Sequence, residues 1–164
     1  MRVLGIDPGT YKMGVGVVEG DGGDLSLAFS SVLSPKRRDP MAARLHYLFS
    51  ELSALIGQVG PSEMAIEEPF AGENVRSALA IGQAQAVAMV AAAEHGLTIT
   101  GYAPSQVKQA VTDHGGSSKD QVGEMVRVLL KLDEVPYPAD AADALAVAIC
   151  HINSSYVHTL VITE

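Results

Sequence analysis

The sequence has no tryptophan and only one cysteine, and aromatic residues make up 5% of its 164 residues. A disulfide framework is excluded, because one cysteine has no partner within the chain. Cys150 follows the alanine-rich stretch 144–149, where a small buried hydrophobic residue is expected rather than a reactive thiol.

Long hydrophobic runs are also missing, although 48% of the residues are hydrophobic. The apolar stretches fall well short of the roughly 20 residues that a membrane span requires. Residues 1–7 enter a strand-like run at once, without a charged leader or a small-residue cleavage site. We therefore expect a cytoplasmic chain with no membrane partner, in which residues 1–155 form one domain and residues 156–164 a C-terminal tail.

Basic residues are few: 11 lysines and arginines stand against 19 acidic residues, a formal charge of −8. Phosphate neutralisation by lysine and arginine supplies most of the non-specific affinity for DNA. A protein that coats nucleic acid along its whole surface is therefore excluded, and any nucleic-acid contact needs basic residues gathered on one face.

The order of apolar patterns predicts an α/β fold. Residues 2–7, 13–19 and 25–34 are typical of three hairpin-connected strands, and residues 41–59 of an amphipathic helix that ends at Gly60-Pro61. Short strands at 64–67 and 97–102 then alternate with helices at 74–95, 104–112, 119–131 and 139–152, and residues 157–163 form a strand or a loose tail. These elements predict a mixed sheet of five strands flanked by helices.

Acidic residues stand at the ends of two apolar strands. Asp7 ends the first strand and precedes Pro8-Gly9, where an isolated aspartate is also a common turn former. Glu67 and Glu68 end the strand at 64–67, and strand alternation puts them on opposite faces, so only one of the two can share a site with Asp7.

Two further acids, Asp140 and Asp143, lie three residues apart near the start of the last helix and therefore share one face. They could simply complement the positive end of that helix, a stabilisation of about 0.3 to 1 kcal/mol. Taken together with Asp7 and a glutamate, however, four converging carboxylates would repel one another unless divalent cations lay among them. Oxygen ligands without a cysteine or histidine cluster favour magnesium or manganese, and two such ions would bring the net charge to about −4.

Five ordered motifs resemble the RuvC family of Holliday junction endodeoxyribonucleases, over residues 2–153. They are GIDPGT at 5–10, AIEEPF at 65–70, GQA at 82–84, QVKQ at 106–109 and ADAADALA at 139–146. The resemblance implies a ribonuclease H-like nuclease domain and a homodimer. It implies that this dimer binds four-way junction DNA and resolves it by paired symmetric nicks, in DNA recombination and repair. It also implies two Mg²⁺ ions per active site, with Mn²⁺ as a substitute, and the branch-migration proteins RuvA and RuvB as partners.

The resemblance also assigns the site residues. The family's four acidic metal ligands correspond to Asp7, Glu67, Asp140 and Asp143, which selects Glu67 over Glu68, and Glu68 departs from the uncharged residue that is frequent there. Two lysines near the family's active site correspond to Lys108 and Lys119, where a cation could hold the scissile phosphate; ordinary solvated helix lysines are the alternative.

Nucleic-acid contacts are assigned in the same way. Phe70 matches an aromatic residue that can stack on an unpaired base where the junction opens, and core packing is its alternative. Arg76, Arg44 and the run at 36–38 could contact phosphates, or the run could be a solvated loop. The helix at 74–95 resembles the family's dimer interface, or it is a buried helix within one chain. For His114 and His151, a structural role is favoured over proton transfer.

Three other functions are compatible with parts of the sequence. GIDPGT also resembles the phosphate-binding turn of actin-like and sugar-kinase ATPases, but those need two lobes and the chain holds one copy of the motif. A related nuclease that acts on ribosomal RNA precursors would use the same chemistry. A junction-binding protein without catalysis is disfavoured, because a carboxylate cluster facing phosphate weakens binding.

Overall fold

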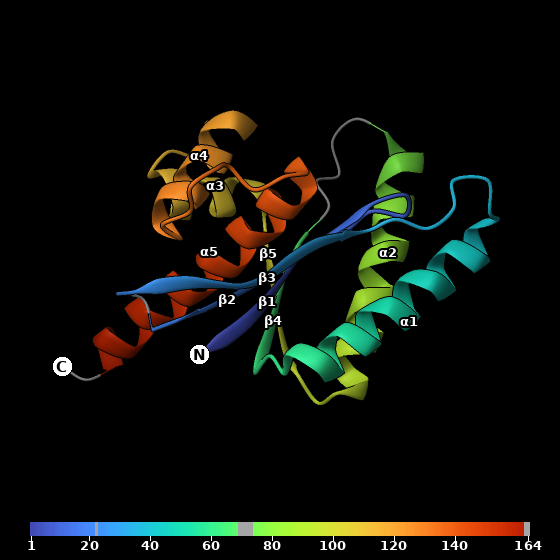
Figure 1. Ribbon diagram of the computed structural model, residues 1–164, viewed down its shortest axis with the longest axis horizontal. Helices are drawn as coiled ribbons and strands as arrows, with labels where there is room; N and C mark the ends of the chain where they lie inside the picture. Colours follow the sequence, from blue (N-terminus) through green and yellow to red (C-terminus); the bar gives the residue numbers. More distant parts are fainter. Residues whose placement is uncertain (22, 69–73, 163–164) are drawn as a thin grey trace.

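The fold is a five-stranded mixed sheet with helices on both faces (Figure 1), as the sequence predicts. The computed structural model describes residues 1–21, 23–68 and 74–162, and of residues 157–162 only the backbone. The strands are β1 (Arg2–Asp7), β2 (Met13–Gly20), β3 (Leu25–Leu33), β4 (Glu63–Glu67) and β5 (Thr98–Tyr102). The helices are α1 (Met41–Val59), α2 (Val75–Glu94), α3 (Pro104–Thr112), α4 (Lys119–Leu129) and α5 (Ala139–Ile162).

The strand order β3-β2-β1-β4-β5 combines a hairpin meander with parallel crossovers. β1 pairs antiparallel with β2 and β2 with β3, whereas β4 runs parallel to β1 and β5 parallel to β4. The carboxyl ends of β1, β4 and β5 therefore meet at one edge of the sheet, where side chains from several elements can form a site.

Helices α1 and α2 lie on one face of the sheet and α3, α4 and α5 on the other (Figure 1), and a hydrophobic cluster fills each of the two interfaces. Along β1, Leu4 and Ile6 face the cluster that contains α1 and α2, whereas Val3 faces the cluster that contains α3, α4 and α5. This alternation follows from the two-residue period of a strand, and both faces of β1 are buried because β1 lies at the centre of the sheet. Cys150 is 1% exposed in the second cluster, which confirms the expectation of a buried residue.

Capping residues fix where several helices begin and end. The side chain of Asn74 accepts hydrogen bonds from the backbone N–H groups of Arg76 and Ser77 at 3.0 and 3.2 Å, so α2 begins as predicted. Ser118 and Gln121 form the predicted capping box of α4. Gly60 ends α1 with a φ of 56°, a left-handed conformation that glycine adopts without strain.

The last helix is longer than the sequence analysis predicts. The expected helix ended at residue 152, with a strand or loose tail at 157–163, whereas α5 continues to Ile162. No glycine or proline interrupts residues 139–162, so nothing in the backbone stops the helix.

Helix α2 has one buried side and one exposed apolar side. By length and composition alone it could cross a membrane, which is weak evidence for a single helix. Ala84, Ala88, Ala91 and Ala92 are buried, and α2 contacts α1. Its other side exposes Val75, Leu79 and Val90 by 78%, 65% and 55%. The helix is therefore neither wholly buried nor wholly solvated, and its exposed stripe has no partner within the described part of the chain.

Candidate active site

The first two acids meet because their strands are parallel neighbours. Ile6 of β1 is in register with Ile66 of β4, so Asp7 and Glu67 follow side by side at the same edge. Glu68 extends elsewhere: its side chain lies across Gly101 of β5, where an added Cβ would come within 3.0 Å of Glu68 Cγ. Its backbone N–H donates to the carbonyl of Tyr102 at 2.9 Å. The geometry thus separates the two glutamates as strand alternation predicts, and Glu67 is the one that faces the lysines described below.

Helix α5 brings Asp140 and Asp143 to the same edge because it packs directly on bare backbone. A Cβ on Gly14 would lie 1.9 Å from the carbonyl oxygen of Asp140, and one on Gly5 would lie 2.0 Å from that of Ala144. Only glycine permits such an approach. Neither glycine is predicted from the sequence to have this role; the signal that points to Gly14 is the glycine alternation in β2, together with the alanine-rich composition of α5.

Lys108 and Lys119 join Glu67 and Asp143 around a small cavity of about 150 Å³, with apolar side chains of α3, α4 and α5 forming its remaining wall. The Nζ of Lys119 lies 2.6 Å from Oδ2 of Asp143, while 74% of the Lys119 side chain stays exposed. The structure therefore brings both predicted lysines beside the predicted acids, from helices that are far from β1 and β4 in the sequence.

The electrostatics of the edge are those of crowded carboxylates. Burial, and after it the negative charges of Glu67, Asp143 and Asp140, together raise the pKa of Asp7 from 3.8 to about 7, against the opposing effect of Lys119. Burial and the charge of Asp143 likewise raise the pKa of Glu67, against Lys119 and Lys108. The hydrogen bond to Asp143 raises the pKa of Lys119, so the ammonium stays protonated. A cation among these acids would relieve the repulsion.

The side-chain positions do not form a closed coordination shell. Among the residues described, no group of three or more aspartate, glutamate, histidine or cysteine side chains is close enough to hold a metal ion. Lys119 occupies one oxygen of Asp143. The donor chemistry nevertheless fits a hard divalent cation, because the residues at this edge are carboxylates and repel one another without one.

The remaining predicted residues lie outside this cluster. Phe70 falls outside the described residues. Arg76 is exposed in the first turn of α2, and His114 is exposed in the loop between α3 and α4. His151 is 4% exposed and lies between the Tyr102 hydroxyl, 2.9 Å from Nδ1, and Glu63, 2.8 Å from Nε2. Glu63 is at the opposite end of β4 from Glu67, so the position of His151 is that of a structural residue, as favoured from the sequence.

The phosphate contact that the sequence suggested for Arg44 is wrong, because the structure buries this side chain. Arg44 is only 6% exposed, and its guanidinium Cζ lies 3.9 Å from the centre of the Tyr11 ring. The apolar period of α1 turns this residue inward, and the ring covers its charge. The run at 36–38 is exposed, in the segment between β3 and α1.

Comparison with known proteins identifies the family. The model of the family described as crossover junction endodeoxyribonuclease RuvC matches residues 3–151. The chain belongs to the RuvC family. RuvC of Dehalococcoides mccartyi is 53% identical over 151 residues, which are 92% of each chain, and RuvC of Chloroflexus aggregans is 51% identical over the same share of each chain.

A solved RuvC structure also matches the fold. T. thermophilus RuvC in complex with a Holliday junction substrate superimposes with a TM-score of 0.91 at 35% identity, over 97% of each chain. The likeness confirms the ribonuclease H-like fold and the resemblance that the five motifs indicated.

Proposed function

We propose that this chain resolves Holliday junctions by hydrolysing phosphodiester bonds at the edge where Asp7, Glu67, Asp140 and Asp143 meet. Membership of the RuvC family makes the chain a crossover junction endodeoxyribonuclease that acts in DNA recombination. The observation that carries the assignment to this edge is the convergence of strand-end and helix-start acids with two lysines around one cavity.

The metal proposed for the four acids is Mg²⁺, two ions per site, with Mn²⁺ as a substitute. Bound there, the ions would supply Lewis-acid activation of water and stabilisation of the leaving oxygen. The chain's own contribution is to hold the carboxylates at the edge: β1 and β4 fix Asp7 and Glu67, and the glycine contact fixes the start of α5. Ligation through Oδ2 of Asp143 would require Lys119 to move, whereas Oδ1 is not paired with Lys119.

Lys119 is the proposed partner of the scissile phosphate. Its ammonium is held beside Asp143 yet is largely exposed, so it can turn from the acid to an incoming phosphate oxygen. Lys108 lies in the same cavity wall, where its charge opposes the rise in the pKa of Glu67 that burial and Asp143 cause. Two fixed positive charges would offset the charge that develops on the phosphate in the transition state. Arg76 and Phe70 remain proposed DNA contacts.

The proposed assembly is a homodimer joined through α2. Val75, Leu79, Ala86 and Val90 are exposed and spaced by four, seven and four residues, which places them on one stripe of the helix. A two-fold pair of such stripes would hold two acid clusters in a symmetric arrangement, as paired nicks require. RuvA and RuvB are proposed partners, and the cytoplasm the proposed location.

A matched pair of glutamate variants tests the site. Glu67→Gln should reduce cleavage of a four-way junction in Mg²⁺ by more than about a hundredfold while junction binding persists. Glu68→Gln, one residue away but directed over β5, should cut at close to the rate of the unsubstituted protein. Equal losses in both variants, or a fully active Glu67→Gln, would show that the cluster is not the catalytic centre.

A second pair of variants tests the assembly. Leu79→Glu should convert the dimer to a monomer in sedimentation velocity, because it puts a charge in the apolar stripe of α2. Val128→Glu places the same charge on α4 at a valine that is 51% exposed, and should leave the dimer intact. A Leu79→Glu protein that still sediments as a dimer would exclude this interface.

A further inference from the structure

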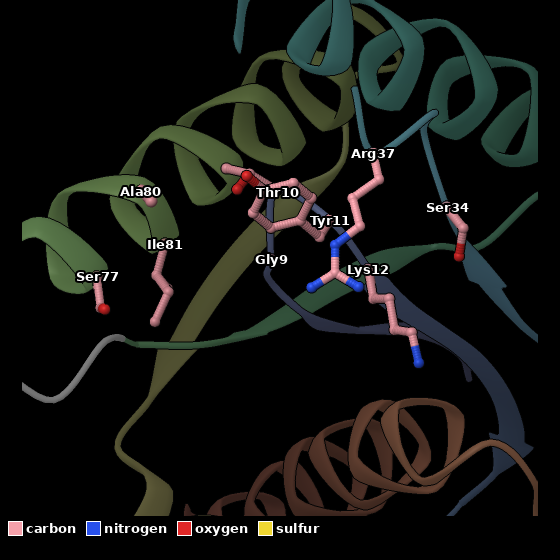
Figure 2. Close-up of a pocket in the computed structure, with 9 residues that line it drawn as sticks. All are labelled: Gly9, Thr10, Tyr11, Lys12, Ser34, Arg37, Ser77, Ala80 and Ile81. Atoms are coloured by element: carbon pink, nitrogen blue, oxygen red, sulfur yellow. The ribbon is translucent and has the colours of Figure 1, made fainter. Parts of the chain in front are cut away.

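A second cavity, of about 590 Å³, lies beside α2 and contains none of the four acids (Figure 2). The turn between β1 and β2, the segment after β3 and the first turns of α2 form its walls, and α5 lies apart from it in the same view. The volume is within the range of roughly 300 to 1,000 Å³ that is usual for small-molecule sites. The cavity has no place in the site already described.

The charges around this cavity are positive. Lys12 and Arg37 line it, both are exposed, and neither forms an ion pair within the part of the chain that the structure describes. Arg44 lies behind the wall: its guanidinium is 3.9 Å from the Tyr11 ring and its Nη1 is 3.4 Å from the carbonyl oxygen of Thr10. The Nε of Arg44 is buried and has no hydrogen-bond partner among the described residues.

These three cations have no carboxylate partner in an ion pair among the described residues. A buried cation is costly unless a negative charge lies near it. The Arg37 guanidinium lies 5.6 Å from the centre of the same Tyr11 ring, so two arginines contact one aromatic ring. Among the described residues, neither arginine forms an ion pair with a carboxylate. An anionic ligand placed against Lys12 and Arg37 would offset the positive charges of these two side chains.

The walls indicate more than a simple anion. Tyr11 is 50% exposed, and Ile81 and Ala80 of α2 line the cavity with it. Figure 2 shows Ser77, Ala80 and Ile81 on α2, and the Arg37 guanidinium between Tyr11 and Lys12. A phosphate alone would leave the aromatic and aliphatic surface in water. A nucleotide satisfies both parts, because its phosphate takes the cations and its base covers the ring.

The cavity is also connected to the catalytic edge by the chain itself. Gly9 and Thr10 line it, and they belong to the turn that Asp7 begins. A base within a duplex is covered on both faces by its neighbours, so only an unstacked base can lie against Tyr11.

We propose that this cavity binds one unpaired nucleotide of the DNA, with its phosphate against Lys12 and Arg37 and its base against Tyr11 and Ile81. The proposal rests on the proposed function, since it takes junction DNA as the ligand. It adds a contact on the α2 side of the sheet, away from the acid cluster, and predicts that the nucleotide comes from beside the branch point, where pairing is open.

Photocrosslinking tests the base contact. The full chain, with chelator to prevent cutting, is bound to four-way junctions that carry 5-iodouracil at successive positions around the branch point, and crosslinked peptides are identified by mass spectrometry. We expect a crosslink at Tyr11 from one or two positions. Ala80→Leu, which fills the cavity without changing its charge, should abolish that crosslink, whereas Ala54→Leu, on the exposed side of α1, should leave it intact.

The salt dependence of binding tests the phosphate contact. The double variant Lys12→Gln, Arg37→Gln should lower the slope of log affinity against log salt concentration by about one, because one phosphate contact is lost. Tight junction binding with no crosslink at Tyr11, or an unchanged slope in the double variant, would overturn the proposal that this cavity binds a nucleotide. Neither result would affect the proposed function. A chain that does not prefer the junction to a matched duplex would overturn the proposed function as well.

Discussion

The raised pKa of Asp7 makes the substitution Asp7→Asn informative about stability as well as cleavage. In the unfolded chain this carboxyl loses its proton near pH 3.8, whereas in the fold it does so near pH 7. Between these values the unfolded state binds fewer protons, so the folded state loses stability as the pH rises from about 4 to about 7. The difference corresponds to roughly 4 kcal/mol at most, and the loss is complete above pH 7.

Asp7→Asn removes this penalty, because the amide has nearly the same shape and carries no charge. In chelator at pH 8 the variant should therefore be more stable than the unsubstituted protein by about 2 to 4 kcal/mol, and near pH 4 the two should be equal. Urea unfolding followed by circular dichroism measures the difference; with a slope of about 2 kcal/mol per molar, the midpoint should rise by about 1 to 2 M. Protein concentration is kept equal, since a dimer's stability depends on it.

A control with the opposite sign is available in Asp21. The backbone N–H of Gly23 donates to its side chain and lowers its pKa, so its ionised form stabilises the fold above the ordinary pKa and that contribution is lost as the pH falls. Asp21→Asn should therefore give no gain at pH 8. An Asp7→Asn protein that is no more stable than the unsubstituted one at pH 8 in chelator would refute the argument from crowded carboxylates.

Three further predictions concern single side chains. Lys119→Gln should slow junction cleavage by about a hundredfold and should also lower stability, because its charge offsets the crowded carboxylates. Lys131→Gln breaks an equally short lysine–aspartate pair of 2.6 Å in which both side chains are exposed, and it should leave the cleavage rate unchanged and change stability by no more than about 1 kcal/mol. Equal cleavage rates for the two variants would contradict the role of Lys119. Gly14→Ala should displace the start of α5 and lower both the urea midpoint and the cleavage rate. The control is Gly57→Ala in α1, where the added Cβ meets only a side-chain atom at 3.6 Å, and it should be neutral or stabilise the fold by up to about 1 kcal/mol. A stable and active Gly14→Ala protein would show that α5 does not need the contact. His151→Gln should lower the free energy of unfolding by about 1 to 3 kcal/mol in urea, because it disrupts a buried hydrogen-bond network. The folded variant should nevertheless cut at the rate of the unsubstituted protein. A loss of cleavage without a loss of stability would instead make the histidine part of the reaction.

The sheet and most helix boundaries could be predicted because their signals are local. Asp7 and Glu67 each end an apolar run, and Asn74 and Ser118 cap helices through bonds to residues two or three positions away. Parallel pairing then follows from the alternation of helices and strands, and it places the strand-end acids at one edge.

Features that depend on contacts between distant segments could not be predicted in this way. Arg44 lies on the inward face of α1, but its contacts with Thr10, 34 residues earlier, and with Tyr11 leave no trace in the local pattern. The approach of α5 to Gly14 likewise joins segments more than 120 residues apart. The two lysines at the acids were placed by family resemblance, since a lysine on a helix is by itself an ordinary solvated residue.

The most direct test of the central claim is cleavage of a mobile four-way junction beside matched linear duplex, RNA–DNA hybrid and structured RNA, each with Mg²⁺ and with chelator. We predict paired symmetric nicks in the junction alone, and only with Mg²⁺. Preferential cutting of RNA or hybrid would keep the fold and the acids but contradict the function, and tight junction binding without cutting in Mg²⁺ or Mn²⁺ would contradict the catalytic site.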